Sequence, residues 1–98
     1  MTDHVFVSAV FVARQEKLEA LGEAIAAVVD ATRSEQGCLR YDPHCCQDDA
    51  CRYFFYEEWE SQKHLDDHMT TPHFLTFIES MKELLAEAPE VKVWKQTR

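Results

Sequence analysis

The stretch from His4 to Val12, HVFVSAVFV, is rich in β-branched and aromatic residues and predicts a strand. Neighbouring side chains of a strand point to opposite faces, and here both faces are largely apolar. An antiparallel sheet with one face in water would alternate apolar and polar residues more cleanly. In a chain of 98 residues, helices can cover one face, so we expect a second copy of the chain to cover the other.

Three later segments also predict strands: Leu39–Cys46, Tyr53–Trp59 and Glu90–Thr97. The first two are joined by Gln47-Asp-Asp-Ala, a sequence typical of turns, so they should form a hairpin. Pro43 lies inside the earlier of these two strands and cannot donate a backbone hydrogen bond. This strand is therefore expected at a sheet edge or with a bulge.

Helical periodicity predicts one helix over about Glu16–Glu35 and another from Thr71 until Pro89, with a short polar helix at Ser61–His68 between them. Ser61 and Thr71 are candidate N-caps. Gly37 is expected at the C′ position of the first long helix, in the left-handed conformation. The resulting order, β-α-β-β-α-β, is the ferredoxin-like α+β arrangement, in one domain over residues 1–98.

The charge balance argues against several kinds of partner. A net charge of −8 disfavours nucleic acid and anionic membranes, since both attract a basic surface. No run approaches the roughly 18 apolar residues that span a bilayer. The N-terminal sequence also lacks the basic segment and cleavage site of a signal peptide. We expect a cytoplasmic protein with no nucleic-acid or membrane partner.

The chain has four cysteines: Cys38, Cys45, Cys46 and Cys51. An even number in a short chain often indicates disulfides, but without a secretory signal free thiols are the expectation. Zinc sites usually contain a Cys-x2-Cys pair, which the Cys-Cys-x4-Cys spacing of the last three does not provide. We therefore expect no metal site, and whether the thiols are redox-active stays open.

Aromatic rings and acids gather on the strand Tyr53–Trp59. Phe55, Glu57 and Trp59 share one of its faces with Tyr53, so an acid lies between two large rings on a face that should be buried. Desolvation there would raise the pKa of Glu57 towards that of a useful general base. The alternative is a structural acid, hydrogen-bonded to a helix N-terminus or a histidine.

Two histidines, His68 and His73, follow this strand. Histidine can accept a proton near neutral pH, and we favour His68 for that role. His73 follows Thr71-Pro72 in the first turn of a helix and is alternatively a structural residue without a chemical role. Tyr41 and Tyr53 are candidate hydrogen-bond donors to a ligand, although tyrosines on strands usually pack first.

Three segments resemble the antibiotic biosynthesis monooxygenase (ABM) family, above all its small quinol-monooxygenase-like members: Glu35-Gln-Gly-Cys-Leu-Arg-Tyr41, Tyr56-Glu-Glu-Trp-Glu-Ser61 and His68-Met-Thr-Thr-Pro-His-Phe74. The resemblance implies a homodimeric α+β barrel in which two ferredoxin-like sheets face each other. We expect that enclosure to shelter Glu57 and Trp59. It also implies that O2 oxidises a quinol or a similar aromatic molecule without flavin, haem or metal.

Within this resemblance, the expected catalytic residues are His68, Glu57 and Trp59. The expected substrate-binding residues are Phe55, Tyr53, Tyr41, His73 and Phe6. Trp59 and Phe55 would position the ring, while His68, helped by Glu57, would accept the phenolic proton.

The sequence also departs from some members of the family. Members that oxidise aromatic polyketides carry an asparagine where Phe55 stands and a tyrosine where Leu65 stands, so that substrate class is disfavoured. Haem-degrading relatives use an asparagine and a histidine at about the positions of Ser8 and Ile78, so haem binding is disfavoured as well.

Two other functions stay open. His68 and Glu57 would also serve as an acid–base pair that isomerises or degrades a small carbonyl or sugar-derived signal metabolite without O2. Alternatively, the chain forms a dimer that binds a small molecule without catalysis. The fold alone does not choose among these functions.

Overall fold

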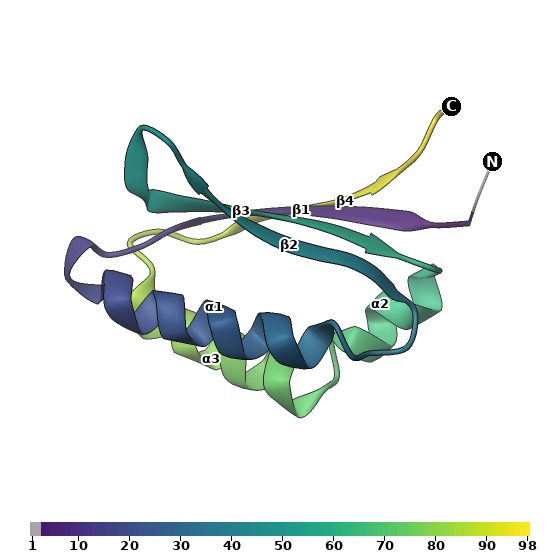
Figure 1. Ribbon diagram of the computed structural model, residues 1–98, viewed down its shortest axis with the longest axis horizontal. Coiled ribbons are helices and arrows are strands. Elements are labelled where there is room, and N and C mark those ends of the chain that lie inside the picture. Colours follow the sequence, from purple (N-terminus) through teal and green to yellow (C-terminus); the bar gives the residue numbers. More distant parts are fainter. Residues whose placement is uncertain (1–2) are drawn as a thin grey trace.

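The computed structural model describes residues 3–98, which form a four-stranded antiparallel sheet with helices on one face (Figure 1). The elements in chain order are β1 (Val5–Val12), the 3-10 helix η1 (Gln15–Lys17), α1 (Leu18–Thr32), β2 (Cys38–Cys46), β3 (Asp49–Trp59), α2 (Gln62–His68), α3 (Pro72–Leu84) and β4 (Glu90–Lys95). This order confirms the ferredoxin-like prediction, including the short helix α2 that precedes α3.

The strand order β2-β3-β1-β4 places β1 inside the sheet and β2 at an edge. Pro43 lies in β2, opposite Phe55 of β3, and the register of this pairing shifts between Cys38 and Arg40. An edge strand has one side without ladder hydrogen bonds, so a residue without an N–H is tolerated there. The predicted edge position of Pro43 is confirmed.

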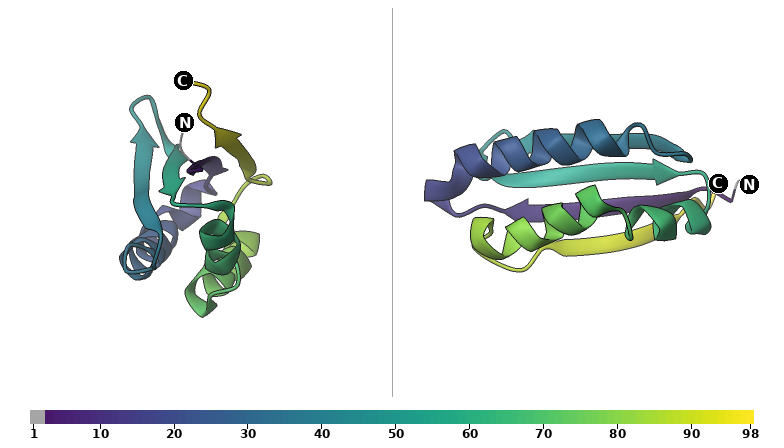
Figure 2. Two further views of the ribbon diagram at one scale, coloured as in Figure 1. Left: turned by 90° about the vertical axis from the view of Figure 1, so that its right-hand side faces the viewer. Right: turned by 90° about the horizontal axis from the view of Figure 1, so that it is seen from below.

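All three α-helices lie on the same side of the sheet (Figures 1 and 2). Val7, Ala9 and Phe11 of β1 face them and are buried in the core. The other face of the sheet carries a group of aromatic side chains that the helices do not cover: Phe6, Phe54, Tyr56 and Trp94. The prediction that helices cover one face of β1 is confirmed.

Several predicted boundaries were wrong. Helix α1 ends at Thr32 instead of about Glu35, and Gly37 lies in the following loop instead of at the C′ position. The stretch Arg33–Gln36 is polar and offers no apolar side chain to extend the buried stripe, so the helix stops. Gly37 does adopt the left-handed conformation, with φ of 84°, and a Cβ there would overlap the imidazole of His64.

The hairpin is tighter than predicted. Cys46 pairs with Asp49, so only two residues form the turn. Strand β3 therefore begins at Asp49, four residues before the predicted start at Tyr53. The side chain of Asp49 accepts a hydrogen bond from the backbone N–H of Cys51 at 3.0 Å.

The four cysteines are free thiols, as predicted. At the other end of the chain, β4 stops at Lys95, short of the predicted Thr97.

Both predicted N-caps are confirmed. The Ser61 hydroxyl accepts a hydrogen bond from the backbone N–H of His64, and the Thr71 hydroxyl accepts one from that of Phe74. Each such cap stabilises a helix by about 1 kcal/mol. The two caps therefore fix the start of the helices that carry His68 and His73.

Within residues 3–98, no helix is both long enough and apolar enough to cross a membrane.

Candidate functional site

Strand β3 carries three site residues to the helix-covered face of the sheet. Phe55, Glu57 and Trp59 have exposed fractions of 1%, 6% and 0%. Their shared, buried face was predicted from the alternation along the strand. The expected cause of burial was wrong, however: the chain's own helices cover these residues, so they need no second sheet facing them (Figure 1).

Glu57 is held by the neighbouring indole. Nε1 of Trp59 donates a hydrogen bond to Oε1 of Glu57 at 3.0 Å, so the partner is neither a helix N-terminus nor a histidine. Burial raises the pKa of Glu57 to about 7; the hydrogen bond from Trp59 opposes this shift, and the negative charge of Glu35 adds to it. Near neutral pH this carboxyl is therefore present in both protonation states.

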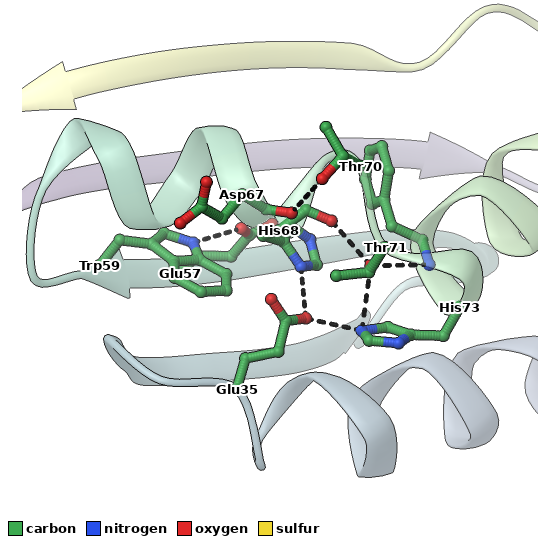
Figure 3. Close-up of polar contacts among 9 residues, drawn as sticks. Glu35, Glu57, Trp59, Asp67, His68, Thr70, Thr71 and His73 are labelled. Atoms are coloured by element: carbon green, nitrogen blue, oxygen red, sulfur yellow. Dashed lines mark hydrogen bonds and ion pairs between the residues drawn. The ribbon is translucent and has the colours of Figure 1, made fainter.

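His68, at the end of α2, is 1% exposed and hydrogen-bonded to Glu35 (Figure 3). Its Nδ1 lies 2.8 Å from Oε2 of Glu35, so the carboxylate hydrogen-bonded to His68 is Glu35, while Glu57, which was expected to help His68, is bonded to Trp59. Because a carboxylate only accepts, Nδ1 carries the ring proton in a neutral imidazole. Burial lowers the pKa of His68 and the bond to Glu35 opposes this, so the ring is neutral at pH 7.

The other ring nitrogen of His68, Nε2, is buried and has no hydrogen-bond partner within residues 3–98. In the tautomer that Glu35 selects, this atom has a free lone pair. A buried polar atom without a partner costs free energy, about 1–3 kcal/mol, and such atoms are uncommon unless they serve a function. Nε2 is thus ready to accept a proton or a hydrogen bond from a ligand.

Glu35 also binds His73. Nε2 of His73, in the first turn of α3, lies 2.6 Å from the same carboxylate oxygen and 3.2 Å from Oγ1 of Thr71. Figure 3 shows the Glu35 carboxylate between the two imidazoles. One acid therefore ties the loop after α1 to the end of α2 and the start of α3. The donor atoms of Glu35, His68 and His73 all lie within 4.8 Å of one another, a spacing that suits a metal ion.

A cavity of about 100 Å³ lies between the sheet and the helices, next to His68. Its polar lining consists of Glu57, His68 and Tyr41, and the other lining residues are apolar: Val7, Ala9, Phe11, Phe55, Leu65, Met69, Phe74, Phe77, Ile78, Pro89, Val91 and Val93. A dry apolar cavity of about 150 Å³ holds benzene in another protein, so this one is on the scale of a single aromatic ring.

Four of the eight predicted site residues line this cavity: Tyr41, Phe55, Glu57 and His68. Tyr41 is 3% exposed, and its ring meets that of His68 edge-on at a centroid distance of 5.4 Å. Burial raises the pKa of Tyr41, so its hydroxyl stays protonated as a hydrogen-bond donor. Trp59 does not line the cavity; its ring lies 4.7 Å from that of His68 and supports it. Trp59 therefore positions both His68 and Glu57.

Three predicted substrate-binding residues lie outside the cavity lining, and His73 is one of them, since it contacts Glu35 instead. Tyr53 is partly buried on β3 opposite Cys45, away from the cavity lining. Phe6 lies on the other face of the sheet, where its ring stacks on that of Tyr56 at 6.3 Å. Since strand residues with even and odd numbers point to opposite faces, Phe6 and the buried residues of β1 cannot line one cavity.

The sequence interpretation missed Glu35 and Phe74 as site residues. Glu35 opens the first segment of the family resemblance, which was a signal, but no role was assigned to it. Phe74 closes the third segment of that resemblance, and its ring lies 4.8 Å from that of His68. Helical periodicity predicts which side of a helix faces inward without indicating which of its side chains border a cavity.

The sequence matches one protein family and several proteins of known sequence. The profile of the antibiotic biosynthesis monooxygenase family matches residues 4–80. The protein sll1783 of Synechocystis is 32% identical over 82 residues, which is 84% of this chain but only 54% of that protein. The chain therefore spans about half the length of this relative.

Two further relatives bear on function. One is Rv0793 of Mycobacterium tuberculosis, whose name assigns it provisionally to the monooxygenases. The two sequences are 33% identical over 95% of this chain and 91% of the length of Rv0793. Its solved structure superposes with a TM-score of 0.92 over 97% of this chain and 96% of that chain, at 30% identity. An isomerase of (4S)-4-hydroxy-5-phosphonooxypentane-2,3-dione from Klebsiella pneumoniae is 26% identical over 76% of each chain.

Proposed function

The chain belongs to the antibiotic biosynthesis monooxygenase family, and from this premise we propose that it oxidises a quinol or a similar single-ring phenol with O2, without a cofactor. The family assignment and the name of the Mycobacterium relative support an oxidoreductase of the monooxygenase kind. One observation supports oxidation of a single-ring phenol above all others. Nε2 of His68 is buried without a hydrogen-bond partner, and His68 lines an apolar cavity of about the size of one ring.

The proposed reaction begins when Nε2 of His68 takes a phenolic proton. The resulting phenolate is electron-rich and reacts with O2 far more readily than the phenol. One oxygen atom enters the ring and the other leaves as water, so a hydroquinone becomes a hydroxyquinone and supplies all the electrons itself. The apolar lining excludes bulk water from the reactive intermediate.

Glu57 and Tyr41 orient the substrate in this proposal. Trp59 occupies one carboxyl oxygen of Glu57, which leaves the other for the substrate. A pKa of about 7 lets Glu57 donate a hydrogen bond when protonated or accept the second phenolic proton when ionised. The ring of Tyr41 lines the same cavity, while its hydroxyl lies next to the side chain of Thr32 on α1.

Isomerisation of a small carbonyl compound is the second candidate, because His68 and Glu57 border one cavity as a base and an acid. The compound named for the Klebsiella relative carries a phosphate. Phosphate recognition normally uses Arg, Lys or a helix N-terminus, and the cavity lining includes no Arg or Lys. An uncharged phenol fits this lining better than a phosphorylated dione does.

An oxygen electrode distinguishes the two candidates. Purified protein is mixed with a panel of hydroquinones under air, and substrate loss is followed in parallel under nitrogen. The proposal predicts that one O2 is consumed per quinol under air and that turnover stops without O2. Turnover of a carbonyl substrate that continues under nitrogen would support the isomerase instead, and no turnover of either substrate would support a binding protein.

A homodimer is also part of this proposal. The uncovered face of the sheet forms a shallow depression of about 580 Å³, which we call the outer face: Phe6, Ser8, Phe54, Tyr56, Glu58, Trp94, Lys95 and Gln96. Trp94 and Phe54 are 54% and 38% exposed there. An aromatic surface of this kind is typical of protein interfaces, and a second copy of the sheet is its proposed cover.

A further inference from the structure

We infer that Glu35, His68 and His73 form a binding site for a divalent transition metal of the zinc class, and that metal at this site inhibits His68 as a base. The inference about the metal site is independent of the proposed oxidation. Only its consequence for activity rests on that proposal.

The donor set is the first argument. Two imidazole nitrogens and one carboxylate oxygen, the ligands of several zinc and iron sites in proteins, lie within 4.8 Å of one another. They come from three separate elements, the α1–β2 loop and helices α2 and α3, which converge on this point (Figure 3). Imidazole prefers zinc, copper, iron or nickel to magnesium or calcium, which argues for a transition metal.

The ligand atoms must rearrange to reach tetrahedral spacing: the two histidine nitrogens, which lie within 4.8 Å of each other, approach by up to roughly 1.4 Å, while the carboxylate oxygen withdraws. Bonds of about 2.1 Å in a tetrahedral site separate neighbouring ligand atoms by roughly 3.4 Å. Oε2 of Glu35 lies 2.8 Å from Nδ1 of His68 and 2.6 Å from Nε2 of His73, so it must withdraw by less than about 1 Å. Glu35 lies in a loop beyond the end of α1, where such a movement disturbs no helix.

His68 is held firmly by its neighbours, whereas His73 leaves the proposed metal site open to solvent. His68 is packed between the rings of Trp59 and Phe74 and is 1% exposed, so its Nδ1 is a fixed ligand. The side chain of His73 is 27% exposed, which opens the site to solvent. A metal ion can therefore enter from the side of His73 and keep a water molecule as its fourth ligand, as exchangeable sites do.

Metal binding changes the tautomer of His68. Without metal, Nδ1 carries the proton that it donates to Glu35, and Nε2 has a lone pair. A metal ion on Nδ1 displaces that proton, and a neutral imidazole then carries its proton on Nε2 instead. Nε2 thereby changes from an acceptor to a donor and cannot take a phenolic proton. Occupancy of the site and base catalysis by His68 exclude each other.

The test is a titration with zinc sulfate, followed by NMR of protein labelled with 15N in its histidine rings. The five histidines are assigned with single His→Gln variants. We expect the ring signals of His68 and His73 to shift together and to saturate at one zinc per chain, with the nitrogen proton of His68 moving from Nδ1 to Nε2. Signals of the exposed His44 should stay in place.

Two variants test the ligand assignment. Glu35→Gln keeps the size of the side chain and should weaken zinc binding by more than about tenfold, since even residues that only orient a ligand contribute that much. Asp67→Asn removes one negative charge from an exposed neighbour in α2 and should bind zinc like the wild type. If Glu35→Gln does not fold, His73→Gln removes another ligand at a partly exposed position.

The four free cysteines are the main competitors for zinc. Binding there would leave the rings of His68 and His73 unshifted, and that result would overturn the inference. Equal zinc affinity of the Glu35→Gln and Asp67→Asn variants would overturn it as well. If the histidine signals shift while oxygen consumption with zinc equals that without it, the site is confirmed, but its effect on the base is refuted.

Discussion

Glu35 and His68 are 33 residues apart in the sequence, yet Oε2 of Glu35 lies 2.8 Å from Nδ1 of His68. This bond decides which nitrogen of the imidazole is free, because the carboxylate only accepts. It leaves Nε2 as a buried acceptor on a ring that borders the cavity. The chemistry that we propose for His68 therefore depends on a residue in the loop that follows helix α1. Glu35 is a positioning residue.

Replacing Glu35 by glutamine should slow oxidation without removing it. The amide can donate as well as accept, so it no longer selects a single tautomer of His68, and a fraction of the molecules lose the free Nε2 lone pair. We expect kcat to fall by about tenfold and KM to change little, since the lining of the cavity stays the same. Steady-state oxygen consumption measures both constants. An unchanged kcat would show that Glu35 does not position the base.

Glu57 should make stability depend on pH. Its pKa is raised from 4.5 to about 7, so between these values the folded state keeps a proton that the unfolded state has released. The free energy of unfolding therefore falls as pH rises through this window, by about 3 kcal/mol from this group. Urea denaturation at pH 4.5 and pH 7.5 should show this fall in the wild type relative to Glu57→Gln, whose amide does not titrate.

The control for that comparison is Glu83→Gln, at an exposed position of α3. This variant should follow the wild type across the same pH range. If Glu57→Gln and Glu83→Gln show the same pH dependence, folding does not raise the pKa of Glu57 and its proposed part in substrate binding is refuted.

The outer face should mediate dimer formation. Trp94→Asp places a charge on the aromatic surface and should yield monomers at concentrations where the wild type is a dimer, because a buried, unpaired carboxylate is costly. Leu75→Asp is a matched control: Leu75 is 55% exposed and Trp94 54%, but Leu75 lies on α3. Light scattering coupled to size exclusion measures the mass. A monomeric wild type, or dimers of all three proteins, would contradict the proposed interface.

Gly37 should tolerate no side chain. Its φ of 84° is strained for any residue with a Cβ, and that Cβ would overlap the ring of His64. We expect Gly37→Ala to lower the free energy of unfolding by about 2 kcal/mol or more. In a His64→Gly background the overlapping atoms Cβ, Cγ and Cδ2 are all absent, and the same change should cost only about 1 kcal/mol. Equal costs in the two backgrounds would show that His64 does not restrict this position.

Local patterns account for the parts of the fold that the sequence predicted correctly. The alternation along β3 identified Phe55, Glu57 and Trp59 as a buried set, because side-chain direction in a strand follows from position alone. Ser61 and Thr71 were identified as N-caps because a capping hydroxyl bonds to a backbone group only three residues away.

The errors concern contacts between distant segments. The hydrogen bond between His68 and Glu35 was not predicted, because no local pattern encodes a contact across 33 residues. The same holds for the source of burial at Glu57. A two-sided apolar strand indicates that both faces are covered, but only the three-dimensional arrangement shows that the helices cover the side that carries Glu57.

The most direct test of the account is the rate of oxygen consumption with a hydroquinone for the wild type, His68→Gln and the control His44→Gln. His44 is exposed on the hairpin and borders no part of the cavity. Loss of a general base typically costs about 10²- to 10⁴-fold, so we predict a fall of that size for His68→Gln and none for His44→Gln, with all three proteins folded. Equal rates for His68→Gln and the wild type would contradict the central claim that Nε2 of His68 takes the substrate proton.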